Sequence, residues 1–136
     1  MEADCNPFQA ELGFTDLTGM DYSQNSIRLA QAISESEGRQ SQITYHTADI
    51  LNPLSVSPKF DSRFTVALDK GTYDAISLAD HESKVGKGEG HIADGYSSAV
   101  SKMLRDEVGH LVITSCNWTE DELIRAFEPR MRPFSS

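Results

Sequence analysis

The sequence is poor in cysteine and has no long apolar run. Its two cysteines, Cys5 and Cys116, form no CxxC pair, which favours a reducing compartment and argues against a disulfide between them. No apolar run approaches the ~20 residues that a membrane-spanning helix needs, and the acidic N-terminus lacks the apolar core of a secretory signal. We therefore expect a cytoplasmic protein, with the nucleus as the alternative compartment, and no membrane partner.

Positive charge is also scarce. Twelve Lys and Arg residues stand against 21 Asp and Glu residues, which gives a net charge of −9. Contacts with phosphates need clustered cations, so this balance argues against nucleic acid as a partner. The negative charge is compatible with electrostatic attraction of a basic substrate, although a charge that merely keeps the protein soluble explains it more simply.

Several motifs of catalytic and metal sites are missing. Ser115 lacks the G-x-S-x-G pattern of a nucleophile elbow, and the sequence assigns no histidine base to Cys116. The glycines at positions 86, 88 and 90 follow no predicted strand, so they indicate a flexible loop rather than a dinucleotide-binding fingerprint. The histidines show no metal-ligand spacing, so we expect no metal site. They are His46, His81, His91 and His110.

Four short segments predict strands, because they are rich in apolar and β-branched residues. They are residues 17–20, 43–50, 64–69 and 110–118. Helical spacing of apolar residues predicts helices between and after these strands. They are residues 24–37, 72–78, 92–104 and a last helix that ends before Pro129. Strands that alternate with helices predict an α/β fold with a largely parallel sheet, here in a single domain over residues 1–136.

Local patterns predict how the helices begin. Ser23 and Thr72 stand at the N-cap positions of the first two helices, and Thr119 with Glu122 forms a T-x-x-E capping box for the last. Residues 80–90 are polar and glycine-rich, which predicts a mobile loop. A further loop, which contains two prolines, separates the second and third predicted strands.

Polar residues follow every predicted strand. They are Asp21, Asp49, Asp69 with Lys70, and residues 115–118. Ligands bind outside the carboxyl ends of parallel strands, so these residues are predicted to share one rim of the sheet.

Each of these polar positions has a plain structural explanation as well as a functional one. Asp21 could accept hydrogen bonds from a ribose diol or cap a turn, and its spacing favours neither alternative. Asp49 could accept a hydrogen bond from an adenine amine or be an ordinary loop acid. Residues 69–72, Asp-Lys-Gly-Thr, would also suit a simple turn.

Three segments together resemble a known family. TGMDYS, ALDKGTYDAISL and ITSCNWT occur in this order, and they resemble the class I (seven-strand) S-adenosylmethionine-dependent methyltransferases. More narrowly, they are similar to the lysine methyltransferases that modify translation elongation factor 1-alpha. The resemblance runs from about Glu11 to Phe127. It implies a Rossmann-like, mostly parallel sheet with flanking helices, S-adenosyl-L-methionine as the cofactor, and a protein substrate that we suspect to be elongation factor 1-alpha.

The resemblance also implies roles for individual residues. Those on the cofactor side are Asp21, Tyr22, Asp49, Ile50 and Asp69. Those on the substrate side are Lys70, Gly71, Thr72, Asn117 and Trp118. It assigns no catalytic base, since transfer of a methyl group mainly needs a neutral amine held in line, and positioning could supply most of the catalysis.

Parts of the family's pattern are missing from the chain. Members begin with a first strand that ends in a glycine-rich loop, and they end with two further strands. We therefore expect an incomplete fold, truncated at both ends, with a gap between the strands at 17–20 and 64–69. A truncated chain that is inactive, or that serves only as a binding module, is one alternative to the enzyme. A second alternative is a receiver-like signalling module, with Asp69 as the phosphate acceptor and Thr114 or Ser115 as the accompanying hydroxyl.

Overall fold

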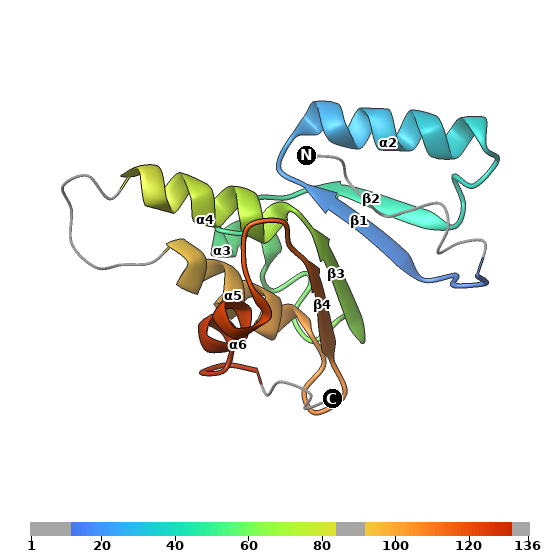
Figure 1. Ribbon diagram of the computed structural model, residues 1–136. Coiled ribbons are helices and arrows are strands. Elements are labelled where there is room, and N and C mark those ends of the chain that lie inside the picture. The colour runs from blue at the N-terminus through green and yellow to red at the C-terminus, as the bar shows by residue number, and fades with distance from the viewer. Residues whose placement is uncertain (1–11, 84–91, 132–136) are drawn as a thin grey trace. The chain divides into compact units, whose positions relative to one another are not determined.

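The computed structural model describes residues 12–83 and 92–131. The chain divides into two compact units, with the boundary between Asp49 and Ile50. Each unit contains one pair of parallel strands with helices packed on it (Figure 1). The prediction of a single domain over residues 1–136 stays a prediction.

The first unit is a strand–helix–strand arrangement. Strand β1 spans Leu17–Asp21, helix α2 spans Gln24–Ser36, and strand β2 spans Ile43–Thr47. The two strands pair in parallel over their whole length, and α2 packs on both of them. This topology places the ends of β1 and β2 at the same edge of the sheet.

Local chemistry explains the bounds of α2. The Ser23 hydroxyl accepts a hydrogen bond from the Ser26 N–H at 3.3 Å, so the predicted N-cap is confirmed. Ile27 is almost fully buried and anchors the apolar face of the helix. The chain leaves the helix through Gly38, whose φ of +70° lies in the left-handed region that glycine adopts without strain.

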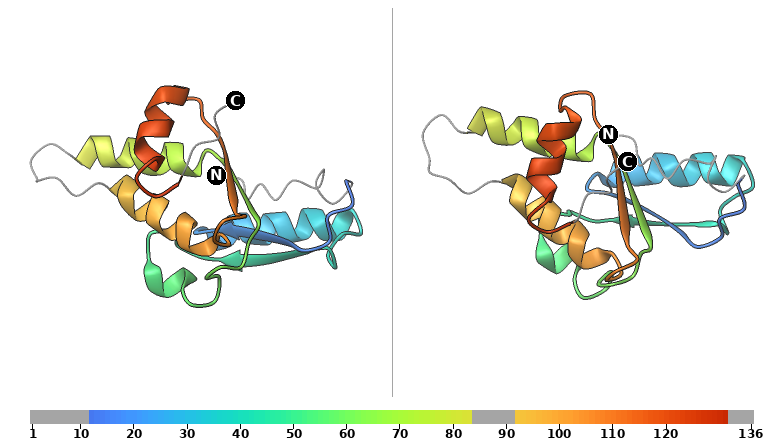
Figure 2. Two further views of the ribbon diagram at one scale, coloured as in Figure 1. Left: turned by 90° about the horizontal axis from the view of Figure 1, so that it is seen from below. Right: turned by 60° about the horizontal axis from the view of Figure 1, so that its bottom comes forward.

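The second unit contains two strands and four helices in its described residues. They are α3 (Pro53–Val56), β3 (Val66–Lys70), α4 (Thr72–Ser83), α5 (Ile92–Met103), β4 (His110–Thr114) and α6 (Glu120–Phe127). Strands β3 and β4 pair in parallel, with Lys70 opposite Thr114 at their carboxyl ends. Helices α4, α5 and α6 lie on the same side of this pair in each view (Figure 2).

Aromatic rings form the centre of this unit's core. The ring of Tyr73 lies 5.1 Å from the ring of Phe127 and 5.4 Å from that of Tyr96, measured between centroids. These rings pack with two aliphatic side chains, Val100 and Leu104. The other face of the β3–β4 pair carries apolar side chains that are about half exposed, namely Val66, Leu68 and Val112.

The predicted α/β class is confirmed, with parallel strands in two separate pairs, as in an incomplete Rossmann-like fold. The strand predicted over 110–118 is shorter, because the Ser115 hydroxyl accepts hydrogen bonds from the Asn117 and Trp118 N–H groups and turns the chain. Helix α4 continues to Ser83, so the loop prediction for 80–90 is wrong at 80–83, and its remainder lies outside the described residues.

One helix was not predicted. Helix α3 forms in the proline-containing loop, because Pro53 suits the first helical position and the Asn52 side chain accepts a hydrogen bond from the Leu54 N–H at 3.1 Å. In the described ranges no helix is both long enough and apolar enough to cross a membrane.

Candidate functional site

The carboxyl ends of the strands carry the predicted site residues in both units. In the first unit, Asp21 ends β1 and Asp49 follows β2 by two residues. In the second unit, Lys70 ends β3, and the 115–118 segment follows β4 directly. Within each unit, the predicted residues therefore share one edge of a parallel pair, as the sequence indicated.

Asp21 is a buried carboxylate with one unsatisfied oxygen. The side chain is only 4% exposed. Its Oδ1 accepts a hydrogen bond from the Ser23 N–H at 2.7 Å, whereas Oδ2 is buried and has no hydrogen-bond partner in the described part of the chain. The capping turn and the ligand explanation are therefore compatible, because the turn uses only one of the two oxygens. A buried acceptor without a donor costs about 1–3 kcal/mol, and a hydroxyl donor would relieve it.

Three other predicted cofactor residues differ in their surroundings. Tyr22 and Asp49 are exposed. Ile50 is partly buried and packs against the core of the second unit. Of these residues, only Asp21 presents a buried acceptor that lacks a donor.

Asp69 is buried and fully engaged within the second unit. Its Oδ1 accepts a hydrogen bond from the Thr72 N–H at 2.8 Å, and its Oδ2 accepts one from the Tyr73 N–H at 3.0 Å. The Tyr96 hydroxyl also donates to Oδ2. Asp69, rather than Thr72, therefore caps α4, and the predicted Thr72 cap is wrong: Thr72 is the first residue of the helix.

The contact between Asp69 and Tyr96 affects the tyrosine's ionisation. Burial, followed by the negative charge of Asp69 and the hydrogen bond to it, raises the pKa of Tyr96 above its ordinary value of 10.0. The hydroxyl therefore remains a donor throughout the neutral and mildly alkaline range. A phosphate acceptor must be accessible, so the burial of Asp69 also argues against the receiver-like alternative.

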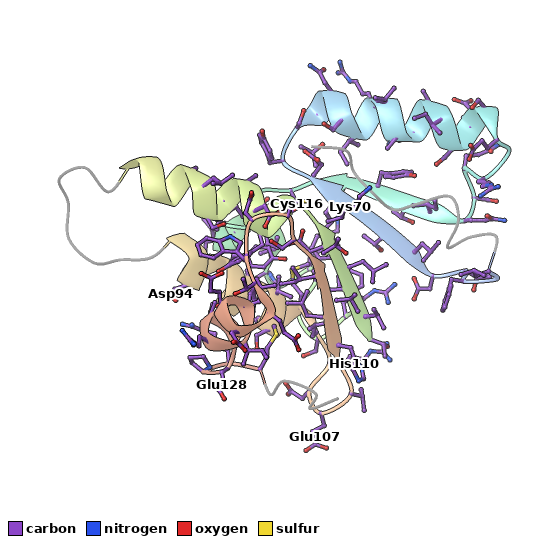
Figure 3. All side chains as sticks on the ribbon, viewed as in Figure 1. Lys70, Asp94, Glu107, His110, Cys116 and Glu128 are labelled. Carbon is purple, nitrogen blue, oxygen red and sulfur yellow. The ribbon has the colours of Figure 1, made fainter. Side chains whose placement is uncertain are left out.

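Residues 70–72 form the turn between β3 and α4, and the first residue of this turn is exposed to solvent. Lys70 is exposed, and Gly71 has a φ of +94° with nothing within 4 Å of the position that a Cβ would occupy. Figure 3 shows Lys70 and Cys116 at the same end of the β3–β4 pair, while His110 lies at the other end. The 70–72 turn and the 115–118 segment thus leave neighbouring strands at one rim.

A second buried carboxylate holds the 115–118 segment. Asp74, in the first turn of α4, accepts a hydrogen bond from the Ser115 hydroxyl at 2.6 Å and another from the Cys116 N–H at 2.9 Å. The Trp118 indole N–H donates to the Ser77 hydroxyl at 2.8 Å. Of the predicted substrate residues in this segment, Asn117 is exposed and Trp118 is partly buried.

Sequence reasoning missed three residues of this arrangement, namely Asp74, Ser77 and Tyr96. Tyr96 lies within the helix predicted over 92–104, and the need of a buried tyrosine for a hydrogen-bond partner is the one available signal. Asp74 looks like an acid that merely suits the positive end of a helix. Nothing in the sequence pairs it with Ser115, which is 41 residues away.

Within residues 12–83 and 92–131, no group of three or more His, Cys, Asp or Glu side chains is arranged to hold a metal ion.

Comparison with known proteins finds relatives that match most of the chain. The chain is 44% identical over 115 residues to EEF1A lysine methyltransferase 2 of Mus musculus, and 40% identical over 118 residues to its counterpart in Homo sapiens. It is 38% identical over 112 residues to the protein-lysine N-methyltransferase EFM4 of Saccharomyces cerevisiae. These matches cover 85%, 87% and 82% of this chain, but only 42%, 45% and 45% of the relatives.

The chain therefore spans less than half the length of these curated relatives. No protein-family model matches it, and no solved structure matches it either. The resemblance indicated by the three sequence segments is confirmed over most of the chain.

Proposed function

We propose that this chain, a relative of the EEF1A lysine methyltransferases over most of its length, carries the cofactor and substrate rims of a protein-lysine N-methyltransferase. We further propose that its cofactor is S-adenosyl-L-methionine and that its substrate is translation elongation factor 1-alpha. The names of relatives that are 36–44% identical support the reaction and the substrate. A cytoplasmic location, with the nucleus as the alternative, is part of the same proposal.

The structural observation that carries the cofactor assignment is the unsatisfied Oδ2 of Asp21. A carboxylate at the end of a strand is the acceptor that ribose hydroxyls need, and Asp21 has one oxygen left for them. Within the first unit, Tyr22 follows β1 directly and Asp49 follows β2 by two residues, so both would lie on the cofactor side with Asp21. When bound, the cofactor supplies a methyl group attached to a positively charged sulfur.

The substrate side consists of the 70–72 turn together with Asn117 and Trp118. These residues would hold the lysine amine in line with the methyl group, and such positioning lowers the barrier without any covalent step on the protein. We propose that Asp69 contributes by fixing this turn, since its oxygens already accept three hydrogen bonds within the unit.

The lysine must lose its proton before it can act as a nucleophile. A free lysine amine has a pKa of about 10.4, and no side chain at the described rim is assigned as its base. The chain's net charge of −9 favours the approach of a basic protein segment. We therefore propose that the protein orients an amine that solvent deprotonates.

Titration calorimetry of the chain with S-adenosyl-L-methionine tests the cofactor assignment. We expect saturable binding at one site per chain, with a Kd on the order of 1 μM to 1 mM, the range typical of enzymes for their substrates. Absence of binding across this range would contradict the proposed cofactor. Cofactor binding without methyl transfer would instead support the alternative of an inactive binding module.

A further inference from the structure

A buried carboxylate, that of Asp74, ties the 115–118 segment to α4. Asp74 is 7% exposed and receives two hydrogen bonds from this segment, one from the Ser115 hydroxyl and one from the Cys116 N–H. Both contacts join parts of the chain that are more than 40 residues apart in sequence. They therefore belong to the tertiary structure and not to a local turn.

Both oxygens of Asp74 must accept a hydrogen bond, because both of the groups that contact them are donors. The Ser115 hydroxyl already accepts hydrogen bonds from the Asn117 N–H at 3.1 Å and the Trp118 N–H at 3.0 Å. Its lone pairs are thereby occupied, so its one hydrogen points to Asp74. The Cys116 N–H can only donate. An ionised carboxylate satisfies both donors, whereas an amide at position 74 could satisfy only one of them.

The same turn of α4 also holds the side chain of Trp118. The indole N–H donates to the Ser77 hydroxyl at 2.8 Å, and the indole ring lies 6.3 Å from the Tyr73 ring at an angle of 52°. The Ser77 hydroxyl in turn donates to the Tyr73 carbonyl at 2.7 Å. Trp118 is thus fixed against the helix that begins at the 70–72 turn.

We infer that Asp74 is a positioning residue, which holds the 115–118 segment on the first turns of α4 so that Asn117 and Trp118 keep a fixed position relative to the 70–72 turn. The inference rests on the proposed function, in that these two segments form the substrate side. It adds to that function a residue that connects them. Asp69 fixes the 70–72 turn at the start of α4, and Asp74, in the first turn of this helix, fixes the 115–118 segment.

The substitution Asp74→Asn tests this inference, with Asp94→Asn as the matched control. Asp94 is an acid on the neighbouring helix α5, its side chain is 57% exposed, and its ion pair with Arg130 is long at 3.9 Å. Trp118 is the only tryptophan in the chain, so its fluorescence reports directly on the segment. Circular dichroism establishes that each variant folds.

With Asp74→Asn we expect the Trp118 emission to shift to longer wavelength and its quenching by acrylamide to increase. We expect the KM for elongation factor 1-alpha to rise about 10-fold, because small misplacements of positioning groups have effects of this size or larger. The KM for S-adenosyl-L-methionine should stay unchanged, and Asp94→Asn should match the wild type in every measurement. A general loss of structure would not separate the two KM values in this way.

The inference is overturned if the Trp118 fluorescence of Asp74→Asn is unchanged. It is also overturned if the fluorescence shows that Trp118 has become exposed while the KM for the protein substrate stays unchanged. If the wild-type protein transfers no methyl group, the proposed function fails, but the fluorescence still decides whether Asp74 holds the segment.

If Asp74→Asn does not fold, Ser115→Ala takes its place, because it removes the hydroxyl at the surface end of the same contact. Wild-type fluorescence in Ser115→Ala would then overturn the inference.

Discussion

Three aspartates are buried in the described part of the chain, and each is satisfied to a different extent. Asp69 receives three hydrogen bonds and Asp74 receives two, whereas Asp21 receives one and leaves Oδ2 without a donor. A buried carboxylate is expensive unless hydrogen bonds compensate it. Hydrogen bonds within the second unit therefore compensate Asp69 and Asp74, whereas one oxygen of Asp21 has no donor among residues 12–83 and 92–131.

Replacing Asp21 by Asn separates ligand binding from folding. The amide oxygen can still accept the Ser23 N–H, and the amide nitrogen replaces the oxygen that lacks a partner. We expect the free energy of unfolding to stay about the same, because one unpaired buried group replaces another while a buried charge is removed. The affinity for S-adenosyl-L-methionine should fall at least about 10-fold, or ~1.4 kcal/mol.

Urea denaturation and calorimetry measure the two effects of Asp21→Asn. Asp106→Asn, which changes an exposed acid of the second unit, serves as the control and should alter neither. A less stable Asp21→Asn variant with undiminished affinity for the cofactor would show that Asp21 is only a turn residue.

Tyr96→Phe is expected to change how stability depends on pH. In the wild type the raised pKa of Tyr96 means that the folded state keeps the phenol proton above pH 10, where the unfolded chain releases it. This contribution to stability is therefore fully present below pH 10 and declines as the pH rises further. Phenylalanine cannot ionise, so the variant should lose stability less steeply there, by up to about 1.4 kcal/mol per pH unit.

Denaturation curves of the wild type and Tyr96→Phe, recorded from neutral pH to roughly one unit above the ordinary tyrosine pKa of about 10, measure this difference. Near neutral pH the variant should be less stable by about 1 kcal/mol, because Asp69 loses a donor. The pKa of Tyr73 is also raised, mainly by burial, but that residue is common to both proteins and its effect cancels. Parallel curves above pH 10 would contradict the role given to the Tyr96 hydroxyl.

At the scale of whole elements, the sequence predicted what local patterns determine. The caps of α2 and α6 were predicted correctly, because Ser23 and Thr119 act on N–H groups three residues away. The cap of α4 was assigned to the wrong residue, since Asp69 looked like the end of a strand. The contact of Asp74 with Ser115 could not be predicted, because the fold alone brings these distant residues together.

The capping box of α6 provides a test at this scale. The Thr119 hydroxyl accepts a hydrogen bond from the Glu122 N–H, and the Glu122 side chain accepts one from the Thr119 N–H at 2.9 Å. Thr119→Ala should lower the free energy of unfolding by about 1 kcal/mol, the usual value of an N-cap. Thr119→Ser keeps the hydroxyl and should stay close to the wild type in the same urea denaturation. Equal losses in the two variants would show that the cap is not responsible.

The two faces of the β3–β4 pair should respond differently to truncation. Leu111 packs against the aromatic core, whereas Leu68 lies on the opposite face and is 52% exposed. Leu111→Ala removes core contacts, so we expect a loss of about 2 kcal/mol, the low end of the range for buried leucines. Leu68→Ala should lose about half of that or less. Thermal denaturation compares them, and equal losses would indicate that the outer face is also covered.

For the molecule as a whole, alternating strands and helices predicted the α/β class and the parallel pairing, because hydrophobic periodicity reflects which faces are buried. Each unit places its polar strand ends on one rim, as expected for parallel strands. Helix α3 and the far end of α4 were not predicted, because prolines and polar residues in these segments are typical of loops.

We propose that the protein methylates lysine in elongation factor 1-alpha, with S-adenosyl-L-methionine as the donor. The most direct measurement mixes the protein, cofactor labelled in its methyl group and purified elongation factor 1-alpha, and then follows the label. We predict label on lysine of the elongation factor with the wild-type protein and much less with Asp21→Asn. An elongation factor that stays unlabelled with the wild type, or equal labelling by the wild type and Asp21→Asn, would contradict the account.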